Sequence, residues 1–154
     1  MICYALYPSS MGTLTLISQG NALSGLSFAG PEPTWKYVRD LAIFDCTRRW
    51  LDAYFAGNPT AADFPLSPVG TAFQRQVWDL LLTIPYGETT TYGAIARQLG
   101  ENMSAQAVGQ AVGKNPIAII IPCHRVVSAK GLLTGYAWGI DKKKWLLRHE
   151  EESK

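Results

Sequence analysis

The sequence predicts an α/β (α+β) protein built from two lobes, on the strength of three observations. Short β-favouring runs separated by turn residues fill residues 2–28. A connector with three prolines follows at residues 58–68. Beyond it, apolar residues recur at the spacing of helices. We therefore divide the chain into an N-terminal sheet-and-helix domain, residues 1–65, and a C-terminal domain, residues 66–154.

The N-terminal domain is expected to begin with an antiparallel meander. Its strands are the β-favouring runs at residues 2–7, 13–18 and 22–28, which are separated by serine, glycine and asparagine. Apolar positions at helical spacing then predict one long helix over residues 34–55, and Gly57 is its stop signal.

The first helix of the C-terminal domain has a clear start signal. Thr71 and Gln74 have the spacing of a capping box, in which each side chain bonds the other residue's backbone N–H. The apolar residues that follow share one helix face. They are Phe73, Val77, Leu80, Leu81 and Ile84. Pro85 ends this helix.

Two shorter helices predict a helix-turn-helix. They cover residues 91–99 and residues 105–113, and Ser104 can cap the second. The second helix is almost bare of bulky side chains. It either packs closely against another element or is a slim helix that fits a narrow groove of a duplex. A buried strand is expected at residues 117–121, and a final helix from Asp141.

Composition limits the class of protein. Of the 154 residues, 47% are hydrophobic and 17% are charged, which argues against disorder. We see no signal peptide and no stretch of membrane-spanning length, so we expect a cytoplasmic protein without a membrane partner. The three cysteines are expected to be reduced. With two histidines they do not make an ordinary zinc module, so no metal is expected.

Charge is divided unevenly along the chain, although the formal net charge is only +2. Residues 66–154 hold ten Lys and Arg against seven Asp and Glu, whereas residues 1–65 hold four against five. The C-terminal half is therefore weakly basic, which favours a phosphate-bearing partner.

Cys123 is the candidate for chemistry. It follows an apolar run and Pro122, and His124 and Arg125 come after it. A free cysteine in such a place is often a small buried hydrophobe. Cationic groups beside it would instead favour the thiolate, which is the reactive form. Glu150 on the closing helix could orient His124, so that the three side chains form a nucleophile, a base and a base-orienter.

Several stretches of the sequence recur together in one known family. They lie at residues 70–74, 77–78, 84–89, 92, 95–96, 107–109, 115–116, 122–127, 135–136, 145–147 and 149–150, with weaker ones at 54–57 and 64–66. Over most of the chain they resemble the O6-alkylguanine-DNA alkyltransferases, or methylated-DNA–protein cysteine methyltransferases. The run Pro-Cys-His-Arg-Val-Val at 122–127 is the most specific. The resemblance implies a ribonuclease H-like N-terminal lobe and a C-terminal winged helix-turn-helix lobe.

The resemblance also implies a set of roles. Cys123 would be the nucleophile and permanent acceptor of an alkyl group from O6 of guanine, or from O4 of thymine. His124 would act as its base through a water, Glu150 would orient the imidazole, and Tyr92 would protonate the guanine ring at N3. Asn115 would tie the turn after the slim helix to the active-site strand. The sulfur displaces guanine directly, so no cofactor is needed, and each molecule reacts once.

Further residues would hold the base and the DNA by the same resemblance. The substrate contacts would be the backbone of Cys123 and Val126, Tyr136, Ala137 and Trp138; Trp138 is bulky enough to narrow the pocket against large alkyl groups. The DNA contacts would be Thr91, Ser104, Gln106, Ala107, Gly109 and Arg125. The expected partner is double-stranded DNA containing O6-alkylguanine, bound through its minor groove with the base flipped. The protein is expected to be a monomer, and cooperative binding on DNA stays open.

The sequence departs from the family pattern at Gln106, where the resemblance predicts an arginine. That arginine enters the duplex and fills the gap left by the flipped base. Unstacking a nucleotide costs a few kcal/mol, so its loss is expected to weaken binding or slow flipping. Met103 nearby could supply an apolar wedge instead.

Without the resemblance, several of these residues have structural interpretations. Tyr92 could be a core aromatic, and Arg125 could belong to a buried ion pair. The run Lys142-Lys143-Lys144 is typical of a solvated helix face, although it could also touch phosphates. His149 is typical of a surface position.

Two other functions compete with alkyl transfer. The first is a lesion sensor that binds alkylated DNA without repairing it, but such proteins replace the cysteine, and Cys123 is present. The second is a winged-helix transcription regulator, which fits the helix-turn-helix and leaves the run at 122–127 unexplained.

Overall fold

The computed structural model describes residues 1–131 and 135–154, and it divides into two compact units. Unit 1 comprises Met1–Val69 and Pro116–Ala118, and unit 2 comprises Gly70–Asn115 and Ile119–Lys154. The boundary that we placed after residue 65 lies just before the one at Val69. The return of Pro116–Ala118 to unit 1 is a feature that the sequence did not indicate.

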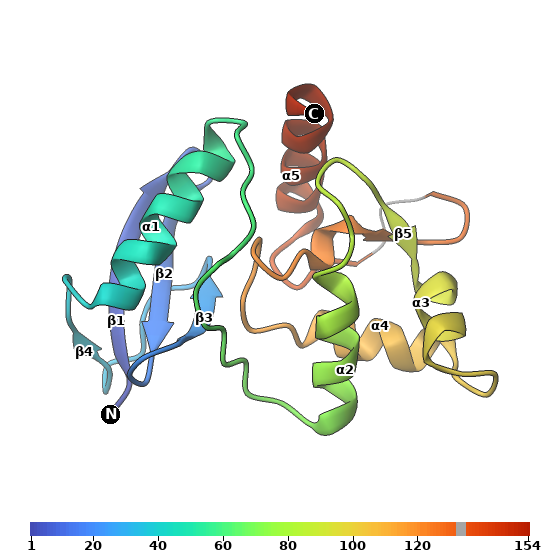
Figure 1. The fold of residues 1–154 in the computed structure, drawn as a ribbon, viewed down its shortest axis with the longest axis horizontal. Helices are drawn as coiled ribbons and strands as arrows, with labels where there is room; N and C mark the ends of the chain where they lie inside the picture. Colours follow the sequence, from blue (N-terminus) through green and yellow to red (C-terminus); the bar gives the residue numbers. More distant parts are fainter. Residues whose placement is uncertain (132–134) are drawn as a thin grey trace. The chain divides into compact units, whose positions relative to one another are not determined.

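Unit 1 is a four-stranded sheet with one helix along it (Figure 1). Strands β1 (Cys3–Ser9), β2 (Gly12–Ser18) and β3 (Leu23–Ser27) pair antiparallel in sequence order, as the sequence predicts. Strand β4 (Lys36–Tyr37) adds a parallel edge beside β1. Side chains alternate across a strand, so Leu14 and Leu16 of β2 share one face, and both are fully buried.

The helix of unit 1 begins later than the sequence predicts. Helix α1 covers Ala42–Phe55, so the prediction of a helix from residue 34 was wrong at its start. The Lys36 N–H donates to the Ile2 carbonyl and the Val38 N–H to the Tyr4 carbonyl. These bonds to β1 satisfy the backbone of this segment as an edge strand, and tertiary pairing therefore overrides the helical spacing of its apolar residues.

Unit 2 starts with helix α2 (Ala72–Leu81), and its predicted capping box is confirmed. The Gln74 N–H donates to Thr71 Oγ1 at 3.1 Å, and the Thr71 N–H donates to Gln74 Oε1 at 2.9 Å. Trp78 from the buried face of α2 donates its Nε1–H to the Ala111 carbonyl at 2.9 Å. That bond fixes α2 against the slim helix of the helix-turn-helix.

The predicted helix-turn-helix is present as α3 (Tyr92–Leu99) and α4 (Ala105–Gly113). Thr91 caps α3 and Ser104 caps α4, each accepting a backbone N–H at 3.0 Å. Strand β5 (Thr90–Thr91) pairs in parallel with β6 (Val126–Val127). A Cβ on Gly109 would lie 3.6 Å from Tyr92 Cδ1, so the small residues of α4 let the two helices pack closely.

The strand predicted at residues 117–121 was wrong. Only Ile117 makes a bridge, to Leu26, and the following residues form turns. Ile119 has φ = 69°, a conformation that a β-branched side chain rarely adopts. All five residues are nonetheless buried. The apolar run therefore reports burial, which a strand and a buried turn share.

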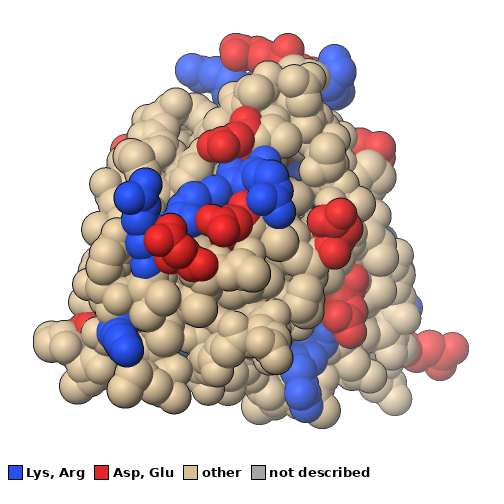
Figure 2. Space-filling model, turned by 60° about the vertical axis from the view of Figure 1, so that its left-hand side comes forward, with Lys and Arg blue, Asp and Glu red and all other residues tan. Residues whose placement is uncertain are grey.

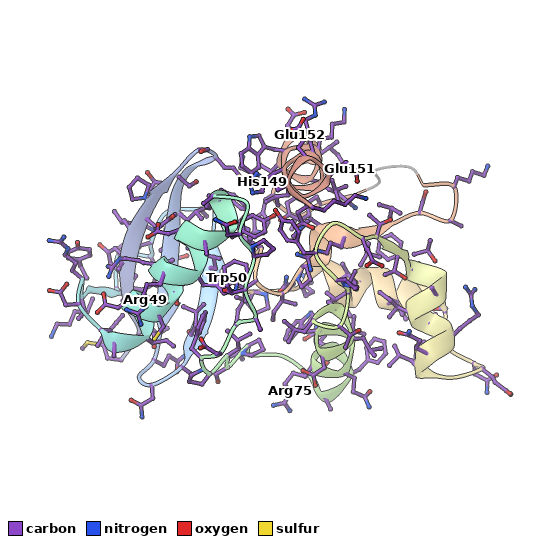
Figure 3. All side chains as sticks on the ribbon, turned by 45° about the horizontal axis from the view of Figure 1, so that its top comes forward. Arg49, Trp50, Arg75, His149, Glu151 and Glu152 are labelled. Atoms are coloured by element: carbon purple, nitrogen blue, oxygen red, sulfur yellow. The ribbon has the colours of Figure 1, made fainter. Side chains whose placement is uncertain are left out.

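The chain ends with helix α5 (Ile140–Ser153), one residue from the predicted start. His149, labelled in Figure 3, stacks its ring on Trp145 with 5.1 Å between centroids. The face in Figure 2 mixes acidic and basic side chains. Within the described ranges, no helix is long and apolar enough to cross a membrane.

Candidate functional site

The backbone around Cys123 is fixed by the proline before it. Pro122 has φ = −82° and ψ = 65°, and the Cys123 N–H donates to the Ile121 carbonyl at 2.8 Å. This is an inverse γ-turn, and a 3₁₀ helix, Cys123–Arg125, follows it directly. Asn115 Nδ2 donates to the same Ile121 carbonyl at 2.8 Å, so Asn115 ties the turn after α4 to the residues before Cys123, which form turns in place of the expected strand.

A pocket of about 190 Å³ lies beside Cys123, and its walls come from unit 2. It brings together residues from α3, α4, the 3₁₀ helix and the segment before α5. They are Tyr92, Gly109, Val112, Gly113, Asn115, Cys123, Gly135, Tyr136, Ala137 and Trp138. Six residues of the predicted site, other than Cys123, thus share one pocket with the thiol. Cys123 itself is only 6% exposed.

His124 and Glu150 form a buried pair. His124 Nε2 lies 2.5 Å from Glu150 Oε2. An ionised carboxylate only accepts hydrogen bonds, so the imidazole hydrogen is on Nε2 and Nδ1 carries a lone pair. Burial lowers the pKa of His124; Glu150 opposes this, and Arg125 and Lys143 add to it, so the ring is neutral at neutral pH. The buried Nδ1 has no hydrogen-bond partner among the described residues.

Four contacts converge on the Glu150 carboxylate. Besides His124, Arg125 contributes Nε at 2.8 Å and Nη2 at 3.2 Å, and the Gly87 N–H lies 3.1 Å away. Gly87 has φ = 80°, which suits glycine, and its turn aims the N–H. Burial alone would raise the pKa of Glu150, but the bonds to and charges of His124 and Arg125 lower it to about 2. Glu150 is therefore ionised across the physiological range.

Arg125 has the contacts of a buried ion pair. Its Nη1 donates to the Ile84 carbonyl at 2.7 Å, and its guanidinium carbon lies 5.6 Å from the centre of the Tyr86 ring. With Nε and Nη2 on Glu150, the guanidinium is directed at the protein, and the residue is only 8% exposed. Of the two interpretations of Arg125, this geometry favours the ion pair over a DNA contact.

The Cys123 thiol lies among groups that act on it in opposite directions. Burial raises the pKa of Cys123. A hydrogen bond from Asn115 and the charge of Lys143 lower that pKa in part. Burial, together with the nearby sulfur, in turn raises the pKa of Tyr136 well above its ordinary value. Tyr136 therefore keeps its proton, and its buried hydroxyl has no hydrogen-bond partner among the described residues.

Lys143 is the site residue that the sequence analysis missed. The expectation of a solvated face was wrong for it, because its side chain is fully buried. Its Nζ donates to the Val126 carbonyl at 2.7 Å and to the Gly135 carbonyl at 3.2 Å. Helical spacing could have found it, since Lys143, Leu146 and Glu150 follow at i, i+3 and i+7 and so share the buried face.

The residues that we predicted to contact DNA differ in their structural roles and in their exposure. The side chains of Thr91 and Ser104 cap α3 and α4, as described above. Gln106 is exposed in the first turn of α4, while Ala107 and Gly109 are half-buried along the same helix. The exposed end of α4 therefore carries a polar side chain that is available to a partner.

Comparisons with known proteins bear on this arrangement. The family model of the 6-O-methylguanine DNA methyltransferase DNA-binding domain matches residues 72–152, and that of the ribonuclease-like domain of the same proteins matches residues 2–68. Together the two models span nearly the whole chain. This chain belongs to the methylated-DNA–protein-cysteine methyltransferase family.

Individual relatives agree with the family models. The chain is 48% identical to the methylated-DNA–protein-cysteine methyltransferase of Mycobacterium tuberculosis, over 98% of this chain and 93% of that protein. It is 44% identical to that of Methanosarcina acetivorans, over 96% and 97%. The crystal structure of the M. tuberculosis O6-methylguanine methyltransferase matches with a TM-score of 0.88 and 46% identity, covering 100% of this chain and 95% of that one.

A second crystal structure shows the M. tuberculosis protein in complex with DNA, and it matches with a TM-score of 0.89 over 98% of this chain and 94% of that one. The resemblance drawn from the motifs is thus confirmed. The predicted fold class is confirmed as well: the N-terminal domain is ribonuclease-like, and the C-terminal one is the family's DNA-binding domain.

Proposed function

We propose that this protein repairs DNA by moving an alkyl group from O6 of guanine onto Cys123. The reaction of the family is methyl transfer from O6-methylguanine in DNA to a cysteine of the protein, and DNA binding comes with it. One observation carries the choice of Cys123: its thiol lines a pocket next to a neutral imidazole that a buried carboxylate orients.

The geometry supports a direct displacement. A water between His124 Nδ1 and Cys123 would pass the thiol proton to the imidazole, which suits a buried nitrogen in need of a partner. The thiolate then attacks the alkyl carbon, the S–C bond forms, and the electron pair of the O6–C bond stays with guanine. Tyr92, which lines the pocket, would donate a proton to N3 of the departing base.

Backbone groups would hold the flipped base. The Val126 carbonyl already accepts from Lys143 Nζ. A carbonyl oxygen has two lone pairs, so one is left for the exocyclic amine of guanine. The Cys123 carbonyl likewise accepts the Val126 N–H and keeps a second lone pair. Ala137, which also lines the pocket, would place its backbone toward O6.

The DNA would be duplex and would be bound through its minor groove by α4. Helix α4 is slim, it packs against Tyr92 at Gly109, and its first turn exposes Gln106. A flipped base leaves a gap in the stack, and a side chain from this turn can fill it. We expect the protein to bind as a monomer, with sedimentation on duplexes of increasing length as the measurement that distinguishes cooperative binding.

The deciding experiment is intact mass after incubation with an O6-methylguanine duplex, beside one with O4-methylthymine. A gain of one methylene on the Cys123 peptide is expected, and it should vanish in Cys123→Ala while DNA binding is kept, because groove and phosphate contacts lie elsewhere. Binding without a mass gain would identify a lesion sensor. Transfer retained in Cys123→Ala would refute the choice of acceptor.

Trp138 would set the size of alkyl group that the pocket accepts. It lines the pocket with Cys123, and a bulky indole there leaves less room for a large substituent. We expect Trp138→Ala to react faster with O6-benzylguanine and at an unchanged rate with O6-methylguanine. Equal changes for both substrates would show that Trp138 does not discriminate by size.

A further inference from the structure

Lys143 is a buried cation beside the reacting thiol. It is fully buried, whereas Lys142 is half-buried and Lys144 is exposed on the same helix. Moving an ammonium group out of water is costly unless hydrogen bonds and charges compensate for it. A chain that needed only a packed helix at this place could use leucine or methionine, so the charge requires an explanation.

The hydrogen bonds of Lys143 join two backbone segments beside Cys123. Its Nζ donates to the carbonyl of Val126, the residue that directly follows the 3₁₀ helix opened by Cys123. It also donates to the carbonyl of Gly135, which lines the pocket with Cys123. One ammonium group thus ties the backbone that follows the nucleophile to a residue that lines its pocket.

Lys143 and Cys123 also act on each other electrostatically. Burial raises the pKa of Cys123, and the charge of Lys143 lowers it. Burial lowers the pKa of Lys143, and the Cys123 sulfur raises it. Each residue therefore favours the ionised form of the other, against a burial that disfavours both ions.

The other groups around the thiol set the charge balance. They are Tyr92 from α3, Asn115 after α4, His124 and Arg125 from the 3₁₀ helix, Tyr136 from the segment before α5, and Glu150 from α5. Among the buried side chains of the described part of unit 2, Arg125 and Lys143 are cations, and Glu150 is a carboxylate. Transfer of the thiol proton to the buried His124 leaves this net charge unchanged and creates a second anion, the Cys123 thiolate, whose pKa the charge of Lys143 lowers.

We propose that the Lys143 ammonium is the counter-charge of the Cys123 thiolate and that it holds together the two backbone segments beside the thiolate, at Val126 and Gly135. Lys143 is then a positioning residue for the proposed transfer, on which this inference rests. The His124–Glu150 pair takes the proton, and Lys143 holds the anion that results. Transfer of the alkyl group neutralises the sulfur and removes this partner of Lys143.

The test is the pH profile of alkyl transfer, together with thiolate absorbance, in Lys143→Met, Lys143→Gln and the control Lys144→Met. Loss of a nearby cation should raise the midpoint of the thiol by about one to three pH units. Transfer at neutral pH should then fall about ten- to a thousandfold and recover in alkali. Lys143→Gln keeps hydrogen-bond donors without the charge, so it should shift like Lys143→Met, while Lys144→Met keeps the parent's midpoint. A uniform loss of rate with an unshifted midpoint would overturn the proposal.

A second measurement needs no substitution of Lys143. In protein with nitrogen-labelled lysine, the Nζ signal of Lys143 should titrate at lower pH in Cys123→Ala than in the parent, because the anion is gone. An identical midpoint in both would refute the pairing. Failure of the parent to gain a methylene in the mass experiment would refute the proposed function instead. The thiolate absorbance and the Nζ titration would still test the pairing, since neither depends on alkyl transfer.

Discussion

The two units bury different kinds of polar side chain. In the described residues of unit 1 they are Thr15, Ser18 and Thr47. In those of unit 2 they are Asn115, His124, Arg125, Lys143 and Glu150. Each hydroxyl of unit 1 donates to a nearby backbone carbonyl, at 2.7, 2.6 and 2.8 Å respectively. Unit 2 instead buries two cations, a carboxylate and an imidazole, and hydrogen bonds join three of them, His124, Arg125 and Glu150.

The difference separates a core that serves stability from one that serves chemistry. A neutral hydrogen bond contributes about 1 kcal/mol and leaves no buried charge. A buried ion pair often contributes nothing beyond what apolar packing would give, whereas removing one partner costs about 3–5 kcal/mol. The charges of unit 2 are therefore poorly explained by stability alone. Clusters with shifted pKa values beside a pocket are typical of functional sites, and this one adjoins Cys123.

The largest expected effect comes from Glu150→Gln. It leaves Arg125 buried without its carboxylate and removes the group that orients His124. We expect a loss of about 3–5 kcal/mol in the free energy of unfolding. Alkyl transfer should fall by about a hundredfold or more. The DNA affinity of the folded protein should change little.

Two controls make the Glu150 experiment specific. Glu151→Gln changes the exposed neighbour of Glu150 on α5, which is labelled in Figure 3. It should leave the free energy of unfolding and the rate of alkyl transfer unaltered. Thr47→Val removes a buried hydroxyl of unit 1 and should change the free energy of unfolding by no more than about 1 kcal/mol. Transfer by Glu150→Gln at the parent's rate would show that the buried charges are structural after all.

The second prediction concerns acid. The pKa of Glu150 is about 2 in the folded protein, below the 4.5 of an unperturbed Glu. The stabilisation that ionised Glu150 contributes is therefore fully present above its pKa in the unfolded chain. It is lost as the pH falls through its pKa in the folded protein. That contribution is on the order of 3 kcal/mol. Urea unfolding between pH 5 and pH 2 should show a stability loss in the parent that is absent from Glu150→Gln. Parallel curves would show that Glu150 is not specially stabilised as an anion.

Most of the fold follows from local signals in the sequence. The capping box at Thr71, the serine cap of α4 and the alternation of β1 to β3 depend on neighbours within a few residues, and the structure has them. The errors lie where distant partners decide. The segment before α1 pairs with β1, and the run after Asn115 bends at Ile119.

The site also divides into residues that a local motif identifies and residues whose role depends on distant partners. Cys123 and His124 stand together in a motif, so the sequence is enough to choose them. Lys143 lies in a run of three lysines whose average character is that of a surface. Its burial depends on which face of α5 meets the 3₁₀ helix, and the spacing of Lys143, Leu146 and Glu150 along α5 indicates that face. Arg125 shows the reverse, since the resemblance suggested a DNA contact while the contacts of its side chain are internal.

The smallest expected effect is that of Gln106→Arg, on the exposed turn of α4 and away from the buried charges. An arginine there can stack in the gap left by a flipped base and adds a positive charge among phosphates. We expect tighter binding to duplex DNA and a salt dependence steeper by about 0.9 in the log–log plot. A cation in the first turn of a helix opposes its dipole, so stability should fall by about 0.3–1 kcal/mol. The chemical step on free O6-methylguanine should barely change, because the substitution leaves the Cys123 pocket intact.

Gln106→Ala is the matched variant: it should slow repair in duplex DNA more than in single strands, where the base is already unstacked. Equal losses on the two substrates would show that Gln106 does not fill the gap, and Met103 would become the candidate for that role.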